Sequence, residues 1–375
     1  MDIYHIYWGT SGNAGLYTGE IYQTLANAGY EQKAFVSYYY LFNYGEKVFF
    51  KRTEMEHCRY KGLLRKIMQA LELVYALIVI WLSARKDKPL VINYSYVSRG
   101  NSLIFFFLKQ FKGIEGTRLV ITCHDVIPII DNEAEYNKEI AIKKRIYSLA
   151  DYYIVHTDNS KKELLKLFDV KESQVLMHPF PLMDLSKLDK NRDDRADEIK
   201  FDFLFIGHMR PEKGVDILFN AWQKFHMLYP DSKLCIAGNP NYYKDFLTQN
   251  AEICEKTNIT LKLGFIKDDD YIRIVKSARC VVFPYTGGTN SGVISTVVSL
   301  DRDVITSDIG MFANNPFVPK ENMFKAGDSD SLCRKLTEYK QGRLDSDSPK
   351  RVAEYRKRFE KQVIDAYSRI TGRTM

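Results

Sequence analysis

The sequence has few of the features that hold small or metal-bound proteins together. Its 375 residues include only six cysteines, with no CxxC pair and no cysteine–histidine spacing typical of zinc ligands. We therefore expect neither a zinc site nor a disulfide framework and interpret the cysteines as reduced, mostly buried thiols. The N-terminus lacks the basic segment and continuous apolar run of a signal peptide, which favours a cytoplasmic location.

Acidic side chains are few in one segment of the first half of the chain. The chain has 54 Lys and Arg against 47 Asp and Glu, and a net charge of +7 is too modest to suggest a nucleic-acid partner. Residues 47–118 contain 14 basic and 5 acidic side chains, so this segment carries +9 and the remainder −2. The basic charge therefore belongs to one part of the first half.

The basic segment contains a long apolar run, residues 67–84, flanked by Arg65, Lys66, Arg85 and Lys86. Glu72 inside the run makes a membrane crossing costly. Two interpretations remain: a buried helix that covers a sheet, or an interfacial helix whose basic neighbours meet anionic lipid headgroups. We favour the second, with peripheral contact at the inner face of the cell membrane.

The two halves of the chain begin with the same pattern. An apolar strand at 3–7, a glycine-rich loop and a helix at 16–28 are repeated as a strand at 201–206, a loop at 207–214 and a helix at 215–227. Further short apolar strands alternate with helices in each half, as in parallel sheets covered on both faces. We expect an α/β protein with two doubly wound Rossmann-like domains, 1–185 and 196–355, joined by a charged linker at 183–200. A charged amphipathic helix should end the chain.

Ligands of parallel sheets bind beyond the carboxyl ends of the strands. There, Arg210 and Lys213 precede a helix start, where two cations and the helix dipole would stabilise a diphosphate. They could equally form a solvated turn. Residues 290–293, Asn-Ser-Gly-Val, open another helix after a strand and suggest a second anion site.

His124 and Asp125 also follow an apolar strand, in a loop that continues to Pro128. Adjacent side chains on a loop do not easily face the same small volume, so we expect at most one of them at a reacting centre. A single histidine at a strand end is more often a structural hydrogen-bonding residue.

Five segments, in this order and spacing, resemble the glycosyltransferases of the two-Rossmann-domain (GT-B) fold, specifically family 4. They are GLYTGEIYQTLANAGY, ITCHDVIP, ADYYIVHTDNSKKEL, FLFIGHMRPEKGVDILFNAW and FPYTGGTNSGVISTVVSLDRDVITSDIG. The resemblance spans most of the chain and is more specific in its second half. It implies two domains facing a cleft, a nucleotide-sugar donor in the second, an acceptor in the first, a retaining mechanism, and a last helix (356–375) that returns to the first domain.

The resemblance also implies roles for individual residues. Gly15 would lie against the donor diphosphate, Arg210 and Lys213 would neutralise it, and His124 would contact the transferred sugar. We assign catalytic roles to His124, Asp125, Arg210 and Lys213, and acceptor contacts to Gly12 and Asn13. The donor-binding residues are predicted to be Gly15, Gly207, Arg210, Lys213, Gly214, Tyr285, Asn290, Ser291, Gly292, Val293 and Thr296.

One departure from the family concerns two carboxylates. Many members have two glutamates eight residues apart near the last donor loop, where this chain has Gly288 and Thr296. The sequence is closer to a subgroup with a Ser-Gly-Val helix start, whose backbone N–H groups would still meet phosphate. The carboxylates that the resemblance assigns to the ribose and to the sugar hydroxyls are therefore absent from these two positions.

Two other enzyme classes fit the sequence less well. Metal-dependent (GT-A) transferases need an Asp-x-Asp motif at a strand end, but 328–330 and 345–347 lie in polar stretches where Asp and Ser ordinarily cap helices. Glycines 9, 12 and 15 match a dinucleotide loop, which is weak evidence for an epimerase or dehydrogenase and leaves the repeated start at residue 201 unexplained.

The sequence therefore predicts a retaining glycosyltransferase of the hexosyltransferase type, with no metal or other cofactor. It would move a sugar from a UDP- or GDP-sugar to a glycan or lipid-linked acceptor in surface polysaccharide synthesis. The alternative is a non-catalytic nucleotide-sugar-binding subunit that supports a partner transferase.

Overall fold

A computed structural model gives the fold of the chain. It describes residues 1–7, 13–37, 47–50, 62–95, 102–124, 126–128, 132–182, 198–288, 292–313, 315–344 and 348–373. The chain divides into two compact units, Met1–Pro181 with Lys357–Met375, and Leu182–Arg356. The divisions fall after residues 181 and 356, against expected domain ends at 185 and 355. The expected linker lies almost wholly outside the described residues.

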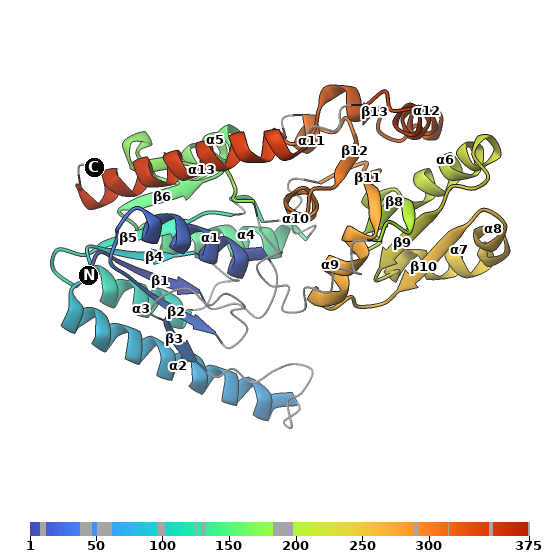
Figure 1. Cartoon of the computed structure of the whole chain (residues 1–375). Helices are drawn as coiled ribbons and strands as arrows, with labels where there is room; N and C mark the ends of the chain where they lie inside the picture. The colour runs from blue at the N-terminus through green and yellow to red at the C-terminus, as the bar shows by residue number, and fades with distance from the viewer. Residues whose placement is uncertain are drawn as a thin grey trace. The chain divides into compact units, whose positions relative to one another are not determined.

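The first unit contains a parallel sheet of seven strands in the order β3-β2-β1-β4-β5-β6-β7 (Figure 1). The strands are β1 (Ile3–Tyr7), β2 (Gln32–Ser37), β3 (Lys47–Phe50), β4 (Val91–Tyr94), β5 (Arg118–Thr122), β6 (Tyr152–Val155) and β7 (Val175–Met177). The helices are α1 (Asn13–Asn27), α2 (Gly62–Asp87), α3 (Ser102–Lys112), α4 (Glu133–Tyr147) and α5 (Asp158–Leu167), with a 3-10 turn at Glu172–Gln174.

The second unit contains a parallel sheet of six strands in the order β10-β9-β8-β11-β12-β13. The strands are β8 (Phe201–Ile206), β9 (Leu234–Gly238), β10 (Ile259–Leu263), β11 (Ala278–Phe283), β12 (Asp303–Ser307) and β13 (Met323–Phe324). The helices are α6 (Val215–Leu228), α7 (Lys244–Gln249), α8 (Ala251–Lys256), α9 (Asp268–Lys276), α10 (Gly292–Ser299), α11 (Gly310–Ala313) and α12 (Ser329–Lys340), with 3-10 turns at Pro211–Lys213, Asn241–Tyr243 and Lys320–Asn322.

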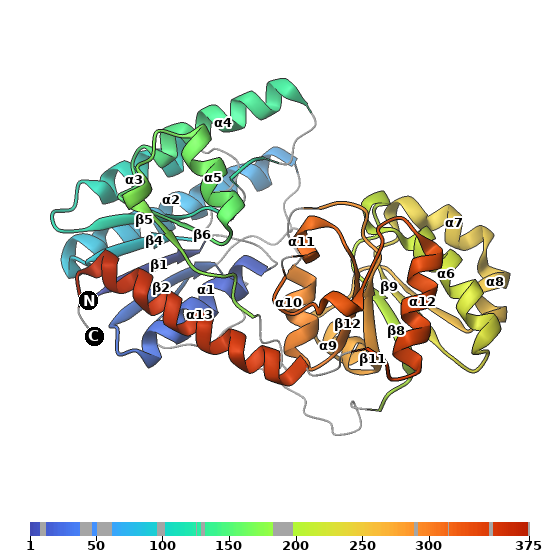
Figure 2. The same ribbon diagram turned by 90° about the horizontal axis from the view of Figure 1, so that it is seen from above.

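Each sheet is covered on both faces, as its apolar strands require (Figure 2). In the first unit, alternate residues of β1 point to opposite faces: Tyr4 and Ile6 join the core under α2, α3 and α4, whereas the ring of His5 lies near the ring of Tyr22 from α1. In the second, Phe203 packs against rings of α6 and α12, which cover one face of the sheet together. The fold expected from the sequence, two doubly wound α/β units, is confirmed.

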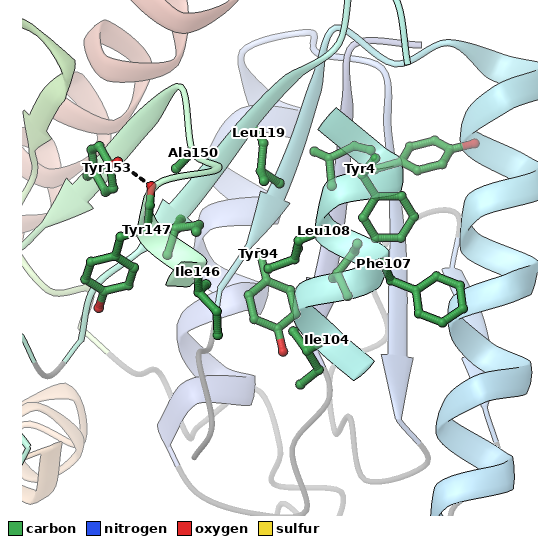
Figure 3. Close-up of a cluster of buried hydrophobic side chains, with 14 of the residues drawn as sticks. Tyr4, Tyr94, Ile104, Phe107, Leu108, Leu119, Ile146, Tyr147, Ala150 and Tyr153 are labelled. Carbon is green, nitrogen blue, oxygen red and sulfur yellow. Dashed lines mark hydrogen bonds between the residues drawn. The ribbon is translucent and has the colours of Figure 1, made fainter. Parts of the chain in front are cut away.

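Figure 3 shows the core of the first unit, where Ile104, Phe107 and Leu108 of α3 lie beside Tyr94 and Leu119. These side chains are at most 7% exposed, and each fully buried residue of this size contributes roughly 1.5–3 kcal/mol. The sheet that positions the strand ends is therefore rigidly supported.

The last helix, α13 (Ser348–Thr371), returns to the first unit, as expected. The Ser368 hydroxyl lies 3.1 Å from that of Tyr30, and the guanidinium of Arg118 donates to the carbonyl of Ile370. Beyond the helix, Arg373 pairs with Asp2 at 3.2 Å. These contacts fix the C-terminal segment to the start of the sheet.

Candidate functional site

The topology of the second sheet marks one position for a ligand. β8 and β11 are neighbours in the sheet. After β8 the chain continues to β9 on one side of this pair, and after β11 it continues to β12 on the other side. Such a switch point opens a crevice beyond the carboxyl ends of the strands. The loops that leave it, 207–214 after β8 and 284–291 after β11, are the two that the sequence selects, although residues 289–291 lie outside the described part.

Backbone contacts bind these two loops together. The N–H of Thr286 donates to the carbonyl of Glu212 at 2.9 Å. Gly214 has the left-handed φ of 61°, and a Cβ at this position would lie 2.0 Å from the carbonyl oxygen of Pro284. Only glycine permits this approach, so Gly214 is a structural requirement of the site.

Both predicted cations lie in this pair of loops. The ammonium of Lys213 lies 3.7 Å from the centroid of the Tyr285 ring, a cation–π contact. The guanidinium of Arg210 is exposed and lies 3.6 Å from the carboxylate of Glu212. Burial lowers the pKa of Lys213; Glu212 raises it and Arg210 lowers it further. An anion bound here would raise that pKa again, because a negative charge stabilises the ammonium form.

Tyr285 gives Lys213 a fixed support. Its side chain is 1% exposed and packs against the rings of Phe283 and Phe312. Its carbonyl accepts a 2.6 Å hydrogen bond from the hydroxyl of Ser307. The face of the Tyr285 ring thus contacts Lys213, one of the two cations predicted to bind the diphosphate.

The start of α6 adds backbone donors to the cations. Gly214 is the N-cap, and no side chain caps this helix. Helix N–H groups without a side-chain partner are suited to phosphate oxygens. Gly207, Arg210, Lys213, Gly214 and Tyr285 are thus brought together in an arrangement suited to a polyanion.

The second predicted cradle is described only in part. Asn290 and Ser291 lie outside the described residues, and α10 begins at Gly292. The hydroxyl of Thr296 donates to the carbonyl of Val293 at 2.8 Å and lies 2.9 Å from that of Tyr271. The hydroxyl hydrogen of Thr296 is therefore already bonded to a carbonyl of the protein. A nucleotide-sugar could contact this hydroxyl only by donating a hydrogen bond to its oxygen.

In the first unit, Asn13 begins α1 and Gly15 lies in its first turn, whereas Gly12 and Asp125 fall outside the described residues. His124 is partly exposed, and its Nε2 lies 2.7 Å from the carbonyl of Ser95. The predicted roles of these residues remain predictions.

The sequence reasoning missed two histidines near His124. His156 follows β6, the strand next to β5, and His178 follows β7, the strand next to β6. Nε2 of His156 lies 3.2 Å from Nδ1 of His124, and the hydroxyl of Tyr17 lies 3.2 Å from Nε2 of His178. A histidine directly after each of two further strands was the available signal, but β7 has only three residues and is not predicted.

A surface hollow lined by Lys200, Lys233 and Asn258 lies elsewhere. These residues stand at the amino ends of β8, β9 and β10, at the edge of the sheet opposite the cationic loop. The hollow is therefore separate from the site at the switch point.

Part of the chain is similar to a known family. Residues 187–359 match the family described as "Glycosyl transferases group 1". An uncharacterized glycosyltransferase of Methanocaldococcus jannaschii is 25% identical over 274 residues, 61% of this chain. The match spans 66% of that relative's length, just under two thirds.

Solved structures share the fold over the whole chain. Anabaena HepE, crystallised with UDP-glucose, has a TM-score of 0.61 at 15% identity, covering 99% of this chain and 98% of HepE. A glycosyltransferase from Rickettsia africae has a TM-score of 0.61 at 14% identity, covering 100% of this chain and 99% of that one. The segment 187–359 is therefore similar to the group 1 glycosyl transferases, and the whole chain has the two-domain α/β fold expected from the sequence, which it shares with GT-B structures.

Proposed function

We propose that this chain is a retaining, metal-independent glycosyltransferase that uses a UDP- or GDP-sugar. Its acceptor would be a glycan or a lipid-linked glycan in surface polysaccharide synthesis. The observation that carries the donor assignment is the position of Lys213 and Arg210 at the switch point, next to an uncapped helix start. HepE, which has the same fold, was crystallised with UDP and with UDP-glucose.

In this proposal the cations act on the leaving group. When the bond from the sugar to the diphosphate breaks, negative charge grows on the phosphate oxygens, and preorganised cations stabilise that charge most in the transition state. The departing phosphate would then take the proton of the acceptor hydroxyl on the same face of the sugar, which retains the anomeric configuration. No carboxylate nucleophile is required.

A thermal-shift series with UDP, GDP and their sugars tests donor binding. A ligand at 100 times its Kd stabilises the folded state by about 2.7 kcal/mol. We expect the nucleotides of one base, uracil or guanine, to raise the melting temperature of the wild type. They should also raise that of Lys256→Ala, which removes a cation of α8 that pairs with Glu252, but not that of Lys213→Ala. No shift with any nucleotide would remove the donor proposal.

Transfer by the isolated chain separates the enzyme from the non-catalytic alternative. With the stabilising donor and a mixture of glycan and lipid-linked acceptors, an enzyme transfers or slowly hydrolyses the sugar. A binding subunit shows the thermal shift and neither reaction. The anomeric configuration of the product, read by NMR, tests retention directly.

We also propose that the first unit meets the inner face of a membrane through α2. This helix is long and apolar enough to span a bilayer, yet only 29% of its most apolar stretch is buried. Leu73, Ala76, Leu77, Ile80 and Ala84 face the core. At the same helical spacing, an exposed apolar stripe consists of Leu63, Ile67, Leu71, Tyr75, Ile78 and Leu82, between 42% and 73% exposed.

Basic side chains accompany the stripe. Lys66, Arg85, Lys86 and Lys88 are exposed, and the guanidinium of Arg85 lies 5.0 Å from the centroid of the Trp81 ring. Apolar side chains in one line with cations near the ends of the helix suit insertion into an anionic leaflet. Each cation near the membrane surface, such as Lys66 or Arg85, would contribute about 1 kcal/mol to the free energy of binding, and less at high salt.

Vesicle sedimentation tests this proposal. Wild-type protein should sediment with anionic vesicles and not with neutral ones, and Leu71→Ser with Tyr75→Ser should release it without lowering the melting temperature. Leu77→Ser, on the buried face, should instead unfold the protein. Failure of the wild type to bind anionic vesicles, or self-association that the stripe variant abolishes, would overturn the membrane assignment.

A further inference from the structure

Three of the seven histidines of the chain gather at one edge of the first sheet. They follow three adjacent strands, β5, β6 and β7. The ring centroids of His124 and His156 are 5.2 Å apart, as are those of His156 and His178. Tyr17 of α1 packs edge-on against His124 at 4.6 Å.

The hydrogen bonds of His124 and His156 require a particular number of hydrogens. Nε2 of His124 lies 2.7 Å from the carbonyl of Ser95, and Nδ1 of His156 lies 3.1 Å from the carbonyl of His178. A carbonyl only accepts, so both nitrogens must carry hydrogen. A third hydrogen must lie between Nδ1 of His124 and Nε2 of His156, 3.2 Å apart.

Two neutral imidazoles carry two hydrogens, whereas these three bonds use three. The complete network therefore belongs to a pair that has bound one extra proton. His178 is not part of this count, because its Nδ1 lies 2.9 Å from the carbonyl of Pro179 and its Nε2 faces the hydroxyl of Tyr17. Those two bonds are satisfied by a neutral ring.

We propose that His156 is a positioning residue for His124, and that the two rings titrate as one unit that shares a single extra proton. This role rests on the proposed transferase function, in which His124 contacts the transferred sugar. Ser95 holds one nitrogen of the His124 ring and His156 holds the other. The ring plane and the charge of His124 are thereby set by a residue on the neighbouring strand.

The surroundings favour one proton rather than two. Burial, and the nearby rings of His124 and His178, lower the pKa of His156 well below the ordinary value for histidine. The other titratable groups around the cluster are Tyr17, Cys123 and, from α13, Tyr367, and burial raises the pKa of all three. They remain neutral near neutral pH, so no described anion of these elements favours a second proton.

NMR of the full chain with labelled histidine tests the proposal without any substrate. In the wild type, the ring signals of His124 and His156 should move together over one step that corresponds to one proton. His156→Phe keeps the packing but removes the acceptor, so the His124 step should move to lower pH. His156→Gln, whose amide oxygen can accept from Nδ1, should restore part of the shift.

Activity supplies the second measurement. The acid limb of the kcat/KM profile should move with the His124 step in His156→Phe and return partly in His156→Gln, with His226→Gln of α6 as the control. Independent titration of the two rings, or a His124 step that is unchanged in His156→Phe, would overturn the proposal. If the chain transfers no sugar but shows the coupled titration, the proposed transferase function is wrong and the proposal for the histidine pair stands.

Discussion

At the carboxyl edge of the second sheet, neighbouring loops touch through backbone atoms, whereas at the first sheet the strand ends meet through side-chain rings. Gly214 against Pro284 and Thr286 against Glu212 are contacts of main chain with main chain. His124, His156 and Tyr17 are contacts of ring with ring. Two units that begin with the same strand, loop and helix thus differ where a ligand would bind.

This difference separates two kinds of chemistry. A site built from backbone N–H groups and a guanidinium keeps its positive charge over a wide pH range, as a diphosphate needs. A cluster of buried imidazoles can gain a proton as the pH falls below the ordinary pKa of histidine. The two edges should therefore respond differently to substitution, to pH and to chelators.

The largest expected effect comes from removing the cations of the second unit. Lys213→Ala and Arg210→Ala should each lower kcat/KM by roughly ten- to a thousandfold, the size expected for losing a donor to developing charge. Lys256→Ala removes an exposed cation of the same unit and should leave kcat/KM unchanged. Unchanged kinetics in both loop variants would show that the site does not hold the diphosphate.

Substituting Gly214 tests whether backbone contact builds the site. Gly214→Ala combines a left-handed backbone with a collision at 2.0 Å from a carbonyl oxygen, and should cost roughly 2–5 kcal/mol of unfolding free energy. Gly342→Ala is the matched control, because its φ is 68° and no atom lies within 4 Å of the added Cβ, so it should cost only about 1–2 kcal/mol. Urea denaturation measures both.

Equal losses in the two glycine variants would mean that the backbone conformation accounts for the whole effect and the approach of Pro284 for none. Hydrogen exchange of peptides from β8 and β11 would locate the damage. It should be confined to the two loops and their strands in Gly214→Ala.

The same comparison explains how far the sequence could predict this fold. Apolar strands such as 3–7 and 201–206 and the repeated loop-helix start were predicted because each pattern is local. β2, β3, β7 and β13 were missed: β7 and β13 are only three and two residues long, and β2 begins with Gln32 and Lys33. They are strands because the neighbouring strand pairs with them, and that pairing is not a local property.

The site divides in the same way. Arg210, Lys213 and Gly214 could be selected as candidates because they lie close together in sequence, between a strand and a helix. The contact of Lys213 with Tyr285 joins residues far apart along the chain, and the pair of His124 with His156 depends on β5 and β6 being adjacent. Both contacts result from the order of the strands in the sheet, which cannot be read from a single sequence.

Acidification should weaken the first unit through its buried histidines. Burial lowers the pKa of His5 and that of His178 to about 4, from the model-peptide value of 6.5. Between these values the unfolded chain binds protons that the folded chain does not. Stability is therefore complete above pH 6.5 and falls as the pH drops towards 4, by about 1.4 kcal/mol per pKa unit for each ring.

Urea denaturation at pH 7, 5.5 and 4.5 measures this slope. His5→Gln removes one of the two titrating rings and should reduce the slope by that ring's share, and hydrogen exchange should show the loss of stability in β1, β4 and α1. A slope that is the same in the wild type and in His5→Gln would contradict the assignment of the effect to buried, neutral histidine.

Chelation is expected to have the smallest effect. In the proposed mechanism the charge that a divalent ion supplies in other transferases comes from Lys213 and Arg210, which EDTA does not remove. Transfer should therefore continue at the same kcat in excess EDTA, and added Mg²⁺ should leave the wild type unchanged. Lys213→Ala sharpens the test: if lost charge causes its defect, Mg²⁺ bound to the donor diphosphate should recover part of kcat/KM in this variant alone. Loss of turnover in EDTA, restored by Mg²⁺ or Mn²⁺ in the wild type, would mean that a metal ion and not the cationic loop stabilises the leaving group.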